Sequence, residues 1–235
     1  MPSEKPVTEV FKGNFISSLD AIKEKLKNIK AYIFDWDGVF NNGHKFADGS
    51  SSFSETDSMG INLIRFNHHL VHNEMASTAI ITGEHNLAAF HFSRRECFND
   101  VYYKIKHKES ALMHLCEQNN VKPSEVLFVF DDVLDFSAAK MAGVRIMVTH
   151  ACNPLLIDFA VKNNLVDYIT FHEGGNGAIR EASELIMHLG GKFDEAIEHR
   201  AHFSERYQVY INKRNTCTPG FYIFSNNQIV QQEPK

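Results

Sequence analysis

Short apolar runs alternate with segments of helical periodicity over most of the chain, and this alternation limits the possible folds more than any other feature. The apolar runs lie at 31–39, 75–83, 100–105, 125–132, 144–150 and 167–171. Segments with apolar residues at helical spacing lie at 60–73, 85–97, 109–119, 134–142, 153–163 and 177–189. Strands that alternate with helices in this way form a parallel sheet with helices on both faces. The sequence therefore predicts an α/β fold with a Rossmann-like sheet.

Polar residues come directly after three of the predicted strands, at the point where each strand ends. Asp35 and Asp37 follow the first strand, Thr82 ends the second, and Asp131 opens an acidic run after a later one. In parallel sheets of this kind the ligand binds at the carboxyl ends of the strands. We therefore expect these four side chains to converge at one edge of the sheet.

Two carboxylates as close as Asp35 and Asp37 repel each other unless a positive charge lies beside them. Mg²⁺ fits such a place, because it binds through one or two carboxylates together with substrate phosphate. Lys108 is a candidate for further positive charge, and Thr82 with the Gly83 backbone offers hydrogen bonds to phosphate oxygens. Either acidic motif alone is equally typical of loop or helix-cap acids. Their joint occurrence after strands, with Thr-Gly and lysine between them, favours a metal-dependent phosphate site.

Length and composition predict one main domain with two extensions. With 235 residues, 43% of them hydrophobic, the chain can bury a single sizeable core. An amphipathic helix over 16–30 places an N-terminal extension at 1–30, and the alternating pattern assigns 31–190 to the main domain. Helical sequence, a Gly/Pro turn and an apolar FYIF run form a C-terminal helix and tail at 191–235.

Charge and hydropathy exclude several classes of partner. A net charge of −5 gives no overall basic face, so we expect no nucleic-acid partner. No apolar stretch approaches the roughly 20 residues that span a bilayer, and residues 1–30 lack the apolar segment of a signal peptide. The four cysteines form no CxxC pair. These features predict a cytoplasmic protein without membrane association.

Residues 39–57 carry the turn sequences NNG and ADGS between aromatic residues, which predicts a β-hairpin flap. Neither insertion point around this segment leaves room for a cap domain. Of the thirteen histidines, His68 and His72 stand four residues apart on a predicted helix, but no HExxH pattern accompanies them. We interpret them as ordinary packed or surface histidines.

The ordered motifs of the chain resemble those of the haloacid dehalogenase superfamily. They are Asp35-Trp36-Asp37-Gly38-Val39, Ile81-Thr82-Gly83, Lys108 and Asp131-Asp132-Val133-Leu134-Asp135. Within the superfamily, the chain is most similar to the capless 3-deoxy-D-manno-octulosonate 8-phosphate phosphatases. That branch carries an aspartate before the first helix, here Asp57, and a late signature that 174–181 (GGNGAIRE) reproduces. The resemblance covers about residues 30–190, which makes the main domain at 31–190 a hydrolase domain with its flap at 39–57.

The resemblance implies a role for each motif residue. Asp35 attacks phosphorus and forms an aspartyl-phosphate, and Asp37 is the general acid and base. Mg²⁺ is held by Asp35, the main-chain carbonyl of Asp37, and Asp131. Thr82 and Lys108 hold the transferring phosphoryl group. Asp132 and Asp135 support the metal or Lys108.

The chain departs from the family pattern at three positions, of which Glu84 bears most on the substrate. The octulosonate enzymes place arginine there, whereas glutamate is typical of the group that acts on nine-carbon nononate 9-phosphates. A carboxylate after Thr82-Gly83 accepts hydrogen bonds from hydroxyl or amine groups of the substrate. Arg94 or Arg95 on the next helix then becomes the candidate partner of the sugar-acid carboxylate. Phe130 and Ser58 stand where relatives usually have glycine.

Capless members of this branch close their sites by forming tetramers through their hairpins, so the resemblance implies a homotetramer. It also leaves an alternative open, namely a catalytically idle regulatory or binding domain associated with sugar-nucleotide synthesis. Loss of Asp35, Asp37, Lys108 or Asp131 would favour that alternative, and all four are present. The prediction is therefore a Mg²⁺-dependent phosphatase that hydrolyses a sugar-acid phosphate monoester.

Overall fold

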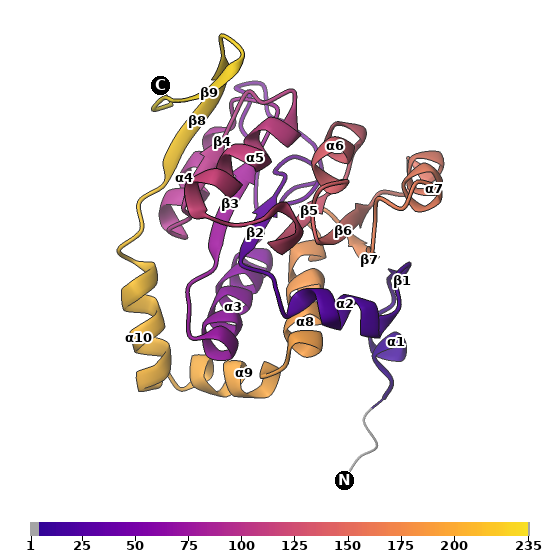
Figure 1. Ribbon diagram of the computed structural model, residues 1–235, viewed down its shortest axis with the longest axis vertical. Coiled ribbons are helices and arrows are strands. Elements are labelled where there is room, and N and C mark those ends of the chain that lie inside the picture. The colour runs from indigo at the N-terminus through magenta and orange to yellow at the C-terminus, as the bar shows by residue number, and fades with distance from the viewer. Residues whose placement is uncertain (1–4, 235) are drawn as a thin grey trace.

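A single sheet organises the computed structural model, which describes residues 5–234 (Figure 1). Its strands are β1 (Asn14–Phe15), β2 (Ala31–Phe34), β3 (Ser77–Ile81), β4 (Asp100–Tyr102), β5 (Val126–Phe130), β6 (Val144–Thr149), β7 (Tyr168–Glu173), β8 (Gly220–Ser225) and β9 (Gln228–Gln231). They lie in the order β1-β7-β6-β5-β2-β3-β4-β8-β9. All neighbours from β7 to β8 are parallel, and only the outermost strands, β1 and β9, are antiparallel to theirs. The predicted α/β fold with a parallel sheet is confirmed.

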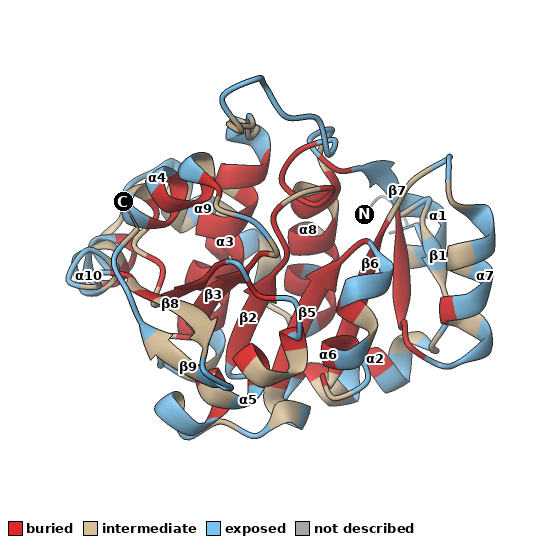
Figure 2. Cartoon of the chain, turned by 90° about the horizontal axis from the view of Figure 1, so that it is seen from above, coloured by how far each residue is buried: buried red, intermediate tan, exposed pale blue. Residues whose placement is uncertain are grey.

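Helices cover both faces of this sheet, as predicted (Figure 2). They are α1 (Val7–Val10), α2 (Leu19–Leu26), α3 (Glu55–His72), α4 (Leu87–Arg95), α5 (Lys108–Asn119), α6 (Phe136–Ala139), α7 (Pro154–Lys162), α8 (Ala178–Gly190), α9 (Phe193–Ala201) and α10 (Glu205–Arg214), with 3₁₀ turns at Pro123–Glu125 and Val133–Asp135. One apolar core lies between the sheet and α2, α3, α4, α8, α9 and α10. The second lies between the sheet and α5, α6 and α7.

The central strand β2 shows why the sheet takes helices on both faces. Tyr32 and Phe34 point into the core with α3 and α8, whereas Ala31 and Ile33 point into the core with α5 and α6. All four side chains are buried. Because successive side chains of a strand alternate between the faces, an uninterrupted apolar run buries both.

Several helix boundaries differ from the predicted ones for local reasons. Helix α3 begins at Glu55 rather than at 60, because Ser54 caps it and accepts a hydrogen bond from the backbone N–H of Thr56. The predicted helix at 134–142 is a 3₁₀ turn followed by the short α6. The predicted helix at 16–30 is shorter as α2, and Asn14 and Phe15 before it add β1 to the edge beside β7.

The segment predicted as a hairpin flap is a loop whose arms do not pair as strands. A turn at its tip is closed by hydrogen bonds between the backbones of Phe46, Gly49 and Ser50. The flap is therefore 41–54, and the end of the predicted range belongs to α3. Its base is fixed by Trp36, whose indole N–H donates to the Ser51 hydroxyl at 2.9 Å. No cap domain occurs between β2 and α3 or elsewhere in residues 5–234.

The C-terminal tail extends the same sheet rather than forming a separate layer. Helices α9 and α10 pack against α3, and the chain then runs to β8, which pairs with β4 (Figure 1). Phe221 of β8 is buried in the core below α4. In the part of the chain that the structure describes, no helix has the length and apolar character needed to cross a membrane.

His68 makes the stability of this fold sensitive to mild acid. It is buried on α3, and its Nδ1 lies 3.3 Å from the Tyr32 hydroxyl. Burial, with the neighbouring His72 and His69, lowers the pKa of His68 from 6.5 to about 3. Between these values the unfolded chain binds a proton that the folded chain does not, so stability falls as the pH falls below 6.5. We expect this group to cost about 2 kcal/mol of unfolding free energy between pH 7 and pH 5.

Urea unfolding at the two pH values checks the expectation. In His68→Gln, whose glutamine side chain does not titrate, the loss of unfolding free energy between pH 7 and pH 5 should be smaller by about 2 kcal/mol. His188→Gln, at an exposed position of α8, is the control and should behave as the unchanged protein does. An equal acid sensitivity of the His68 and His188 variants would contradict the assignment.

Candidate active site

Four of the predicted site residues meet at the carboxyl edge of the sheet. Asp35 follows β2, Thr82 follows β3 and Asp131 follows β5, while Lys108 begins α5 beside them. Together with Asp37 they line one open cleft of about 380 Å³. The convergence follows from the parallel register, since β2 pairs with both β3 and β5 and the three strands end level with one another.

Gly38 allows the loop after β2 to approach the end of β5. Its φ is +81°, in the left-handed region that favours glycine. A Cβ atom at this position would lie 1.9 Å from Oδ2 of Asp131. Both the backbone conformation and the contact therefore require glycine in the Asp-Trp-Asp-Gly motif.

Lys108 bridges two carboxylates in the interior of the cleft. Its Nζ lies 2.8 Å from Oδ2 of Asp35 and 2.5 Å from Oδ1 of Asp135, and only 2% of its side chain is exposed. Burial alone would lower the pKa of Lys108, but the two carboxylates outweigh burial and raise it. The lysine thus remains an ammonium group. Asp135, which is fully buried, holds it beside Asp35.

Asp35 and Asp131, at the ends of β2 and β5, lose favourable contact with water because they are buried. Burial raises the pKa of Asp35 to about 7, against the opposing effect of Lys108. Burial also raises the pKa of Asp131 to about 6, against a hydrogen bond from His150. Raised carboxyl pKa values mark a cluster with less positive charge than its acids need.

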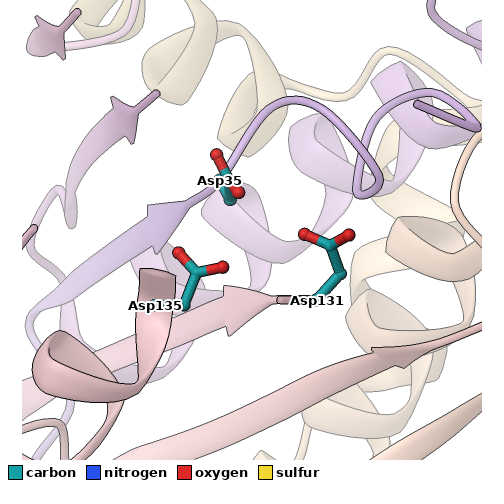
Figure 3. Close-up of side chains that lie close together, drawn as sticks. All are labelled: Asp35, Asp131 and Asp135. Carbon is teal, nitrogen blue, oxygen red and sulfur yellow. The ribbon is translucent and has the colours of Figure 1, made fainter. Parts of the chain in front are cut away.

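A cation of the right size would correct that deficit. Oxygen atoms of Asp35, Asp131 and Asp135 lie within 4.8 Å of one another, and Figure 3 shows the three side chains close together at the ends of their strands and the following turn. Oδ2 of Asp131 lies 3.0 Å from Nε2 of His150, whereas Oδ1 is buried without a hydrogen-bond partner. A buried unpartnered carboxylate oxygen in an all-oxygen cluster fits a hard divalent cation.

Asp37 is held by side chains that sequence reasoning did not select. Its Oδ2 forms an ion pair with Nζ of Lys45 and accepts a hydrogen bond from Nδ2 of Asn86, both at 2.9 Å. Nδ2 of Asn86 also donates to the Thr82 hydroxyl at 2.8 Å. The position of Asn86 before α4 is typical of a helix cap, which gave no sign of a role in the cleft. Lys45 and His150 belong to no motif.

Gly83 and Glu84 line the same cleft, but Arg95 does not reach it. The Arg95 guanidinium pairs with Glu55 at 2.6 Å and with Glu96 at 3.0 Å, and it lies over the ring of Phe53. It also donates to the Ser58 hydroxyl at 2.6 Å. In this structure two carboxylates occupy the donors of Arg95, so its predicted role in binding substrate stays a prediction that the observed contacts do not favour.

The alternative arginine is also engaged elsewhere. Arg94 lies over the ring of Phe221, 4.5 Å from its centroid, and 3.5 Å from Glu233 of the tail.

The two other departures from the family pattern, at Ser58 and Phe130, have structural explanations. Ser58 donates to Glu96 and so helps to hold Arg95 away from the cleft. Phe130 fills the core between Phe128 and Phe136.

The late glycine signature supports the motif loop from behind. A Cβ at Gly174 would lie 2.0 Å from the carbonyl oxygen of Gly38 and 2.5 Å from that of Asn41. Glu181 of the same signature accepts hydrogen bonds from the backbone N–H groups of Phe171 and His172. The signature therefore lets two loops pack backbone against backbone and fixes the loop that carries Asp37.

Gly174→Ala should displace this loop. We expect it to lower the unfolding free energy by about 1–3 kcal/mol, because both atoms in the clash are backbone and cannot rotate away. Gly190→Ala, at the end of α8 with open space around the new methyl group, is the matched control and should leave stability within about 0.5 kcal/mol. Denaturant unfolding of the two variants measures the difference, and equal stability would contradict the close packing.

Known proteins of one family are similar to this chain in amino-acid sequence and in fold. No family model matches the chain. The 3-deoxy-D-manno-octulosonate 8-phosphate phosphatase KdsC of Salmonella typhi is 30% identical over 179 residues, which cover 74% of this chain and 88% of that protein.

Solved structures agree with the sequence comparison. The 3-deoxy-D-manno-octulosonate 8-phosphate phosphatase of Moraxella catarrhalis, in complex with magnesium, phosphate and KDO, aligns with a TM-score of 0.65 and 27% identity. The alignment covers 80% of this chain and all of that one. A HAD superfamily (subfamily III A) hydrolase from Legionella pneumophila aligns with a TM-score of 0.66 and 28% identity, covering 78% of this chain and 96% of that one.

Proposed function

The chain belongs to the 3-deoxy-D-manno-octulosonate 8-phosphate phosphatase family of the haloacid dehalogenase superfamily, and from this premise we propose that it hydrolyses a sugar-acid phosphate monoester with Mg²⁺. It is a hydrolase of phosphoric monoesters. The observation that carries the proposal is the buried bridge from Lys108 to Asp35 beside the unpartnered oxygen of Asp131.

Asp35, Asp131 and the main-chain carbonyl of Asp37 would hold the magnesium ion. The clustered carboxylate oxygens and the orphaned Oδ1 of Asp131 fit it. When bound, the ion neutralises phosphoryl oxygens and so allows an anionic ester to enter an acidic cleft.

Asp35 is the proposed nucleophile. Its Oδ1 accepts a hydrogen bond from the Trp36 backbone N–H at 2.6 Å, and Oδ2 faces Lys108, so the carboxylate is fixed in orientation. In the first step an oxygen of Asp35 bonds to phosphorus and the bond from phosphorus to the ester oxygen breaks. Asp37 gives its proton to the departing alkoxide. In the second step water attacks phosphorus and Asp37 takes a proton from this water. The bond from the Asp35 oxygen to phosphorus breaks, which restores the carboxylate and releases phosphate.

The remaining cleft residues hold the phosphoryl group during both steps. The Lys108 ammonium and the Thr82 hydroxyl supply donors where negative charge is shared over the phosphoryl oxygens. The Gly83 backbone is proposed to add a further contact. Each of these groups is already fixed by the fold before substrate binds.

The substrate is proposed to be 3-deoxy-D-manno-octulosonate 8-phosphate or a nononate 9-phosphate. The eight-carbon ester is suggested by the family, and the nine-carbon ester by Glu84, which is exposed at the cleft and free to accept from substrate hydroxyl or amine groups. The rate of phosphate release from each ester, measured at equal enzyme concentration, identifies which of the two is the better substrate.

The same assay tests the proposal as a whole. Phosphate release from at least one of the two esters should require Mg²⁺ and stop when EDTA removes it. An enzyme that releases no phosphate from either ester, or that is unaffected by EDTA, would overturn the proposal.

Closure of the cleft is proposed to come from other copies of the chain in a homotetramer. Phe46 at the tip of the flap and Leu134 at the mouth of the cleft are both exposed, at 66% and 58%. Exposed apolar side chains of this size are common where a second chain packs. A monomeric mass by light scattering at assay concentration would contradict this part of the proposal.

A further inference from the structure

Asp37 has a set of contacts that its proposed role alone does not require. Its Oδ2 receives two donors from separate elements, Lys45 on the flap and Asn86 at the start of α4. Its Oδ1 has one longer contact, 3.4 Å from Nδ2 of Asn41. Since Oδ2 is fully engaged, Oδ1 is the oxygen left to carry and transfer a proton.

The amide of Asn86 can have only one orientation in this network. An ammonium group cannot accept a hydrogen bond, so the atom facing Lys45 is Oδ1 of Asn86, at 3.0 Å. A carboxylate cannot donate, so the atom facing Asp37 is Nδ2. Asn86 therefore uses both ends of its side chain in the cleft.

Asn86 does so instead of capping its own helix. It is fully buried at the N-cap position of α4, yet its side chain makes no capping hydrogen bond. A side-chain cap is worth about 1 kcal/mol. Asparagine is a good capping residue, yet the side chain of Asn86 leaves the helix uncapped and makes its hydrogen bonds with Lys45, Asp37 and Thr82. This indicates a role in the cleft.

The network also directs the Thr82 hydroxyl. Oγ1 of Thr82 accepts from Nδ2 of Asn86 at 2.8 Å and from the backbone N–H of Glu84 at 3.4 Å. With both acceptor positions in use, the hydroxyl proton points away from Asn86 and is available to a bound group. One buried amide thus sets the orientation of two side chains in the cleft.

We propose that Lys45 and Asn86 are positioning residues for proton transfer by Asp37, which they hold with Oδ1 toward the ester oxygen. The inference rests on the proposed function. Without the two donors, the partly exposed Asp37 carboxylate can rotate about its side-chain bonds and turn toward solvent. Because Lys45 lies on the flap, Asp37 is fully held only while the flap keeps Lys45 beside it, as in this structure.

The dependence of the rate on the leaving group distinguishes this role from a structural one. An alkoxide needs a proton as it departs, whereas p-nitrophenolate leaves without one. The test measures kcat/KM for Lys45→Met and Asn86→Ala on p-nitrophenyl phosphate, phenyl phosphate and the sugar-acid phosphate. This constant covers the steps up to departure of the leaving group and excludes hydrolysis of the aspartyl-phosphate.

We expect the loss to grow along that series, from less than about threefold on p-nitrophenyl phosphate to about 10–100-fold on the sugar ester. The effect of Lys45→Met should also vanish for phenyl phosphate in an Asp37→Asn background, because a positioning residue acts only through its target. Lys162→Met, an exposed lysine on α7, is the matched control and should change no rate.

Equal losses on all three esters, or no loss on any, would overturn the inference while leaving the proposed function in place. Failure of the proposed function is seen separately, in an unchanged protein that hydrolyses none of the three esters with Mg²⁺, and it would overturn the inference as well. Lys45→Met changes a surface side chain of the flap, so the test does not depend on whether the buried Asn86→Ala folds normally.

Discussion

Asp35→Asn should lower phosphate release by about 10⁴-fold or more, because an amide cannot attack phosphorus. The fold should survive the change. Asparagine has nearly the same shape, Lys108 keeps Asp135 as its partner, and the buried carboxylate whose pKa burial raises to about 7 is gone. We expect the unfolding free energy to change by less than about 1 kcal/mol. Phosphate release and urea unfolding of the same preparation measure the two quantities.

A direct test of the nucleophile accompanies the rate. The unchanged protein, quenched in acid during turnover, should carry one phosphoryl group by intact mass, and Asp35→Asn should carry none. Asp158→Asn on the exposed face of α7 is the control for an Asp-to-Asn change and should keep full activity. Residual turnover of Asp35→Asn within tenfold of the unchanged protein would refute the assignment of the nucleophile.

Lys108→Met should have the largest combined effect on activity and stability. It leaves Asp35 and Asp135 buried beside each other with no ammonium between them. Removing one partner from a buried ion pair costs about 3–5 kcal/mol, so we expect a loss of that order in EDTA. Activity should fall by about 10³-fold, since the phosphoryl group loses a fixed positive charge that the fold holds in place beside it.

Magnesium separates the two causes of this effect. If the cation binds among the same carboxylates, it should restore part of the lost stability without restoring the rate. Lys140→Met, at an exposed position after α6, is the control for the substitution and should alter neither. A Lys108→Met protein as stable in EDTA as the unchanged one would show that the two carboxylates do not need the lysine.

Sequence alone predicted the main sheet and the acidic part of the cleft for one physical reason. Strands such as β5 (Val126–Phe130), buried on both faces, are continuous apolar runs in the sequence, and the residues directly after such strands lie at the carboxyl edge of the sheet. Asp35, Thr82 and Asp131 could therefore be placed together from their positions in the chain. The weakly apolar edges were less visible. β1 is only two residues long, too short to give a strand pattern in the sequence. The arms of the flap do not pair as strands, although the turn sequences between them predicted a hairpin.

The contacts that hold the acids were beyond sequence reasoning because they join distant segments. Lys45 and Asn86 are 41 residues apart, and His150, which contacts Asp131, directly follows the neighbouring strand β6. Because Glu84 stands where the family has arginine, Arg94 or Arg95 on the next helix became the predicted partner of the substrate carboxylate. The sequence did not reveal that Glu55 and Glu96, one before Arg95 in the chain and one directly after it, lie within reach of its guanidinium. Residue type indicates what a side chain can bind, and only the packed fold decides which partner is nearest.

The pairing of β8 with β4 changes which strand borders solvent at this end of the molecule. Without the tail, β4 would present an open row of backbone groups, the kind of border along which separate chains join into aggregates. With it, the border is β9, four residues long, bounded by glutamines and followed by Pro234, which has no N–H to offer. Removing β8 and β9 from the chain would thus yield a protein more prone to precipitate than the whole chain.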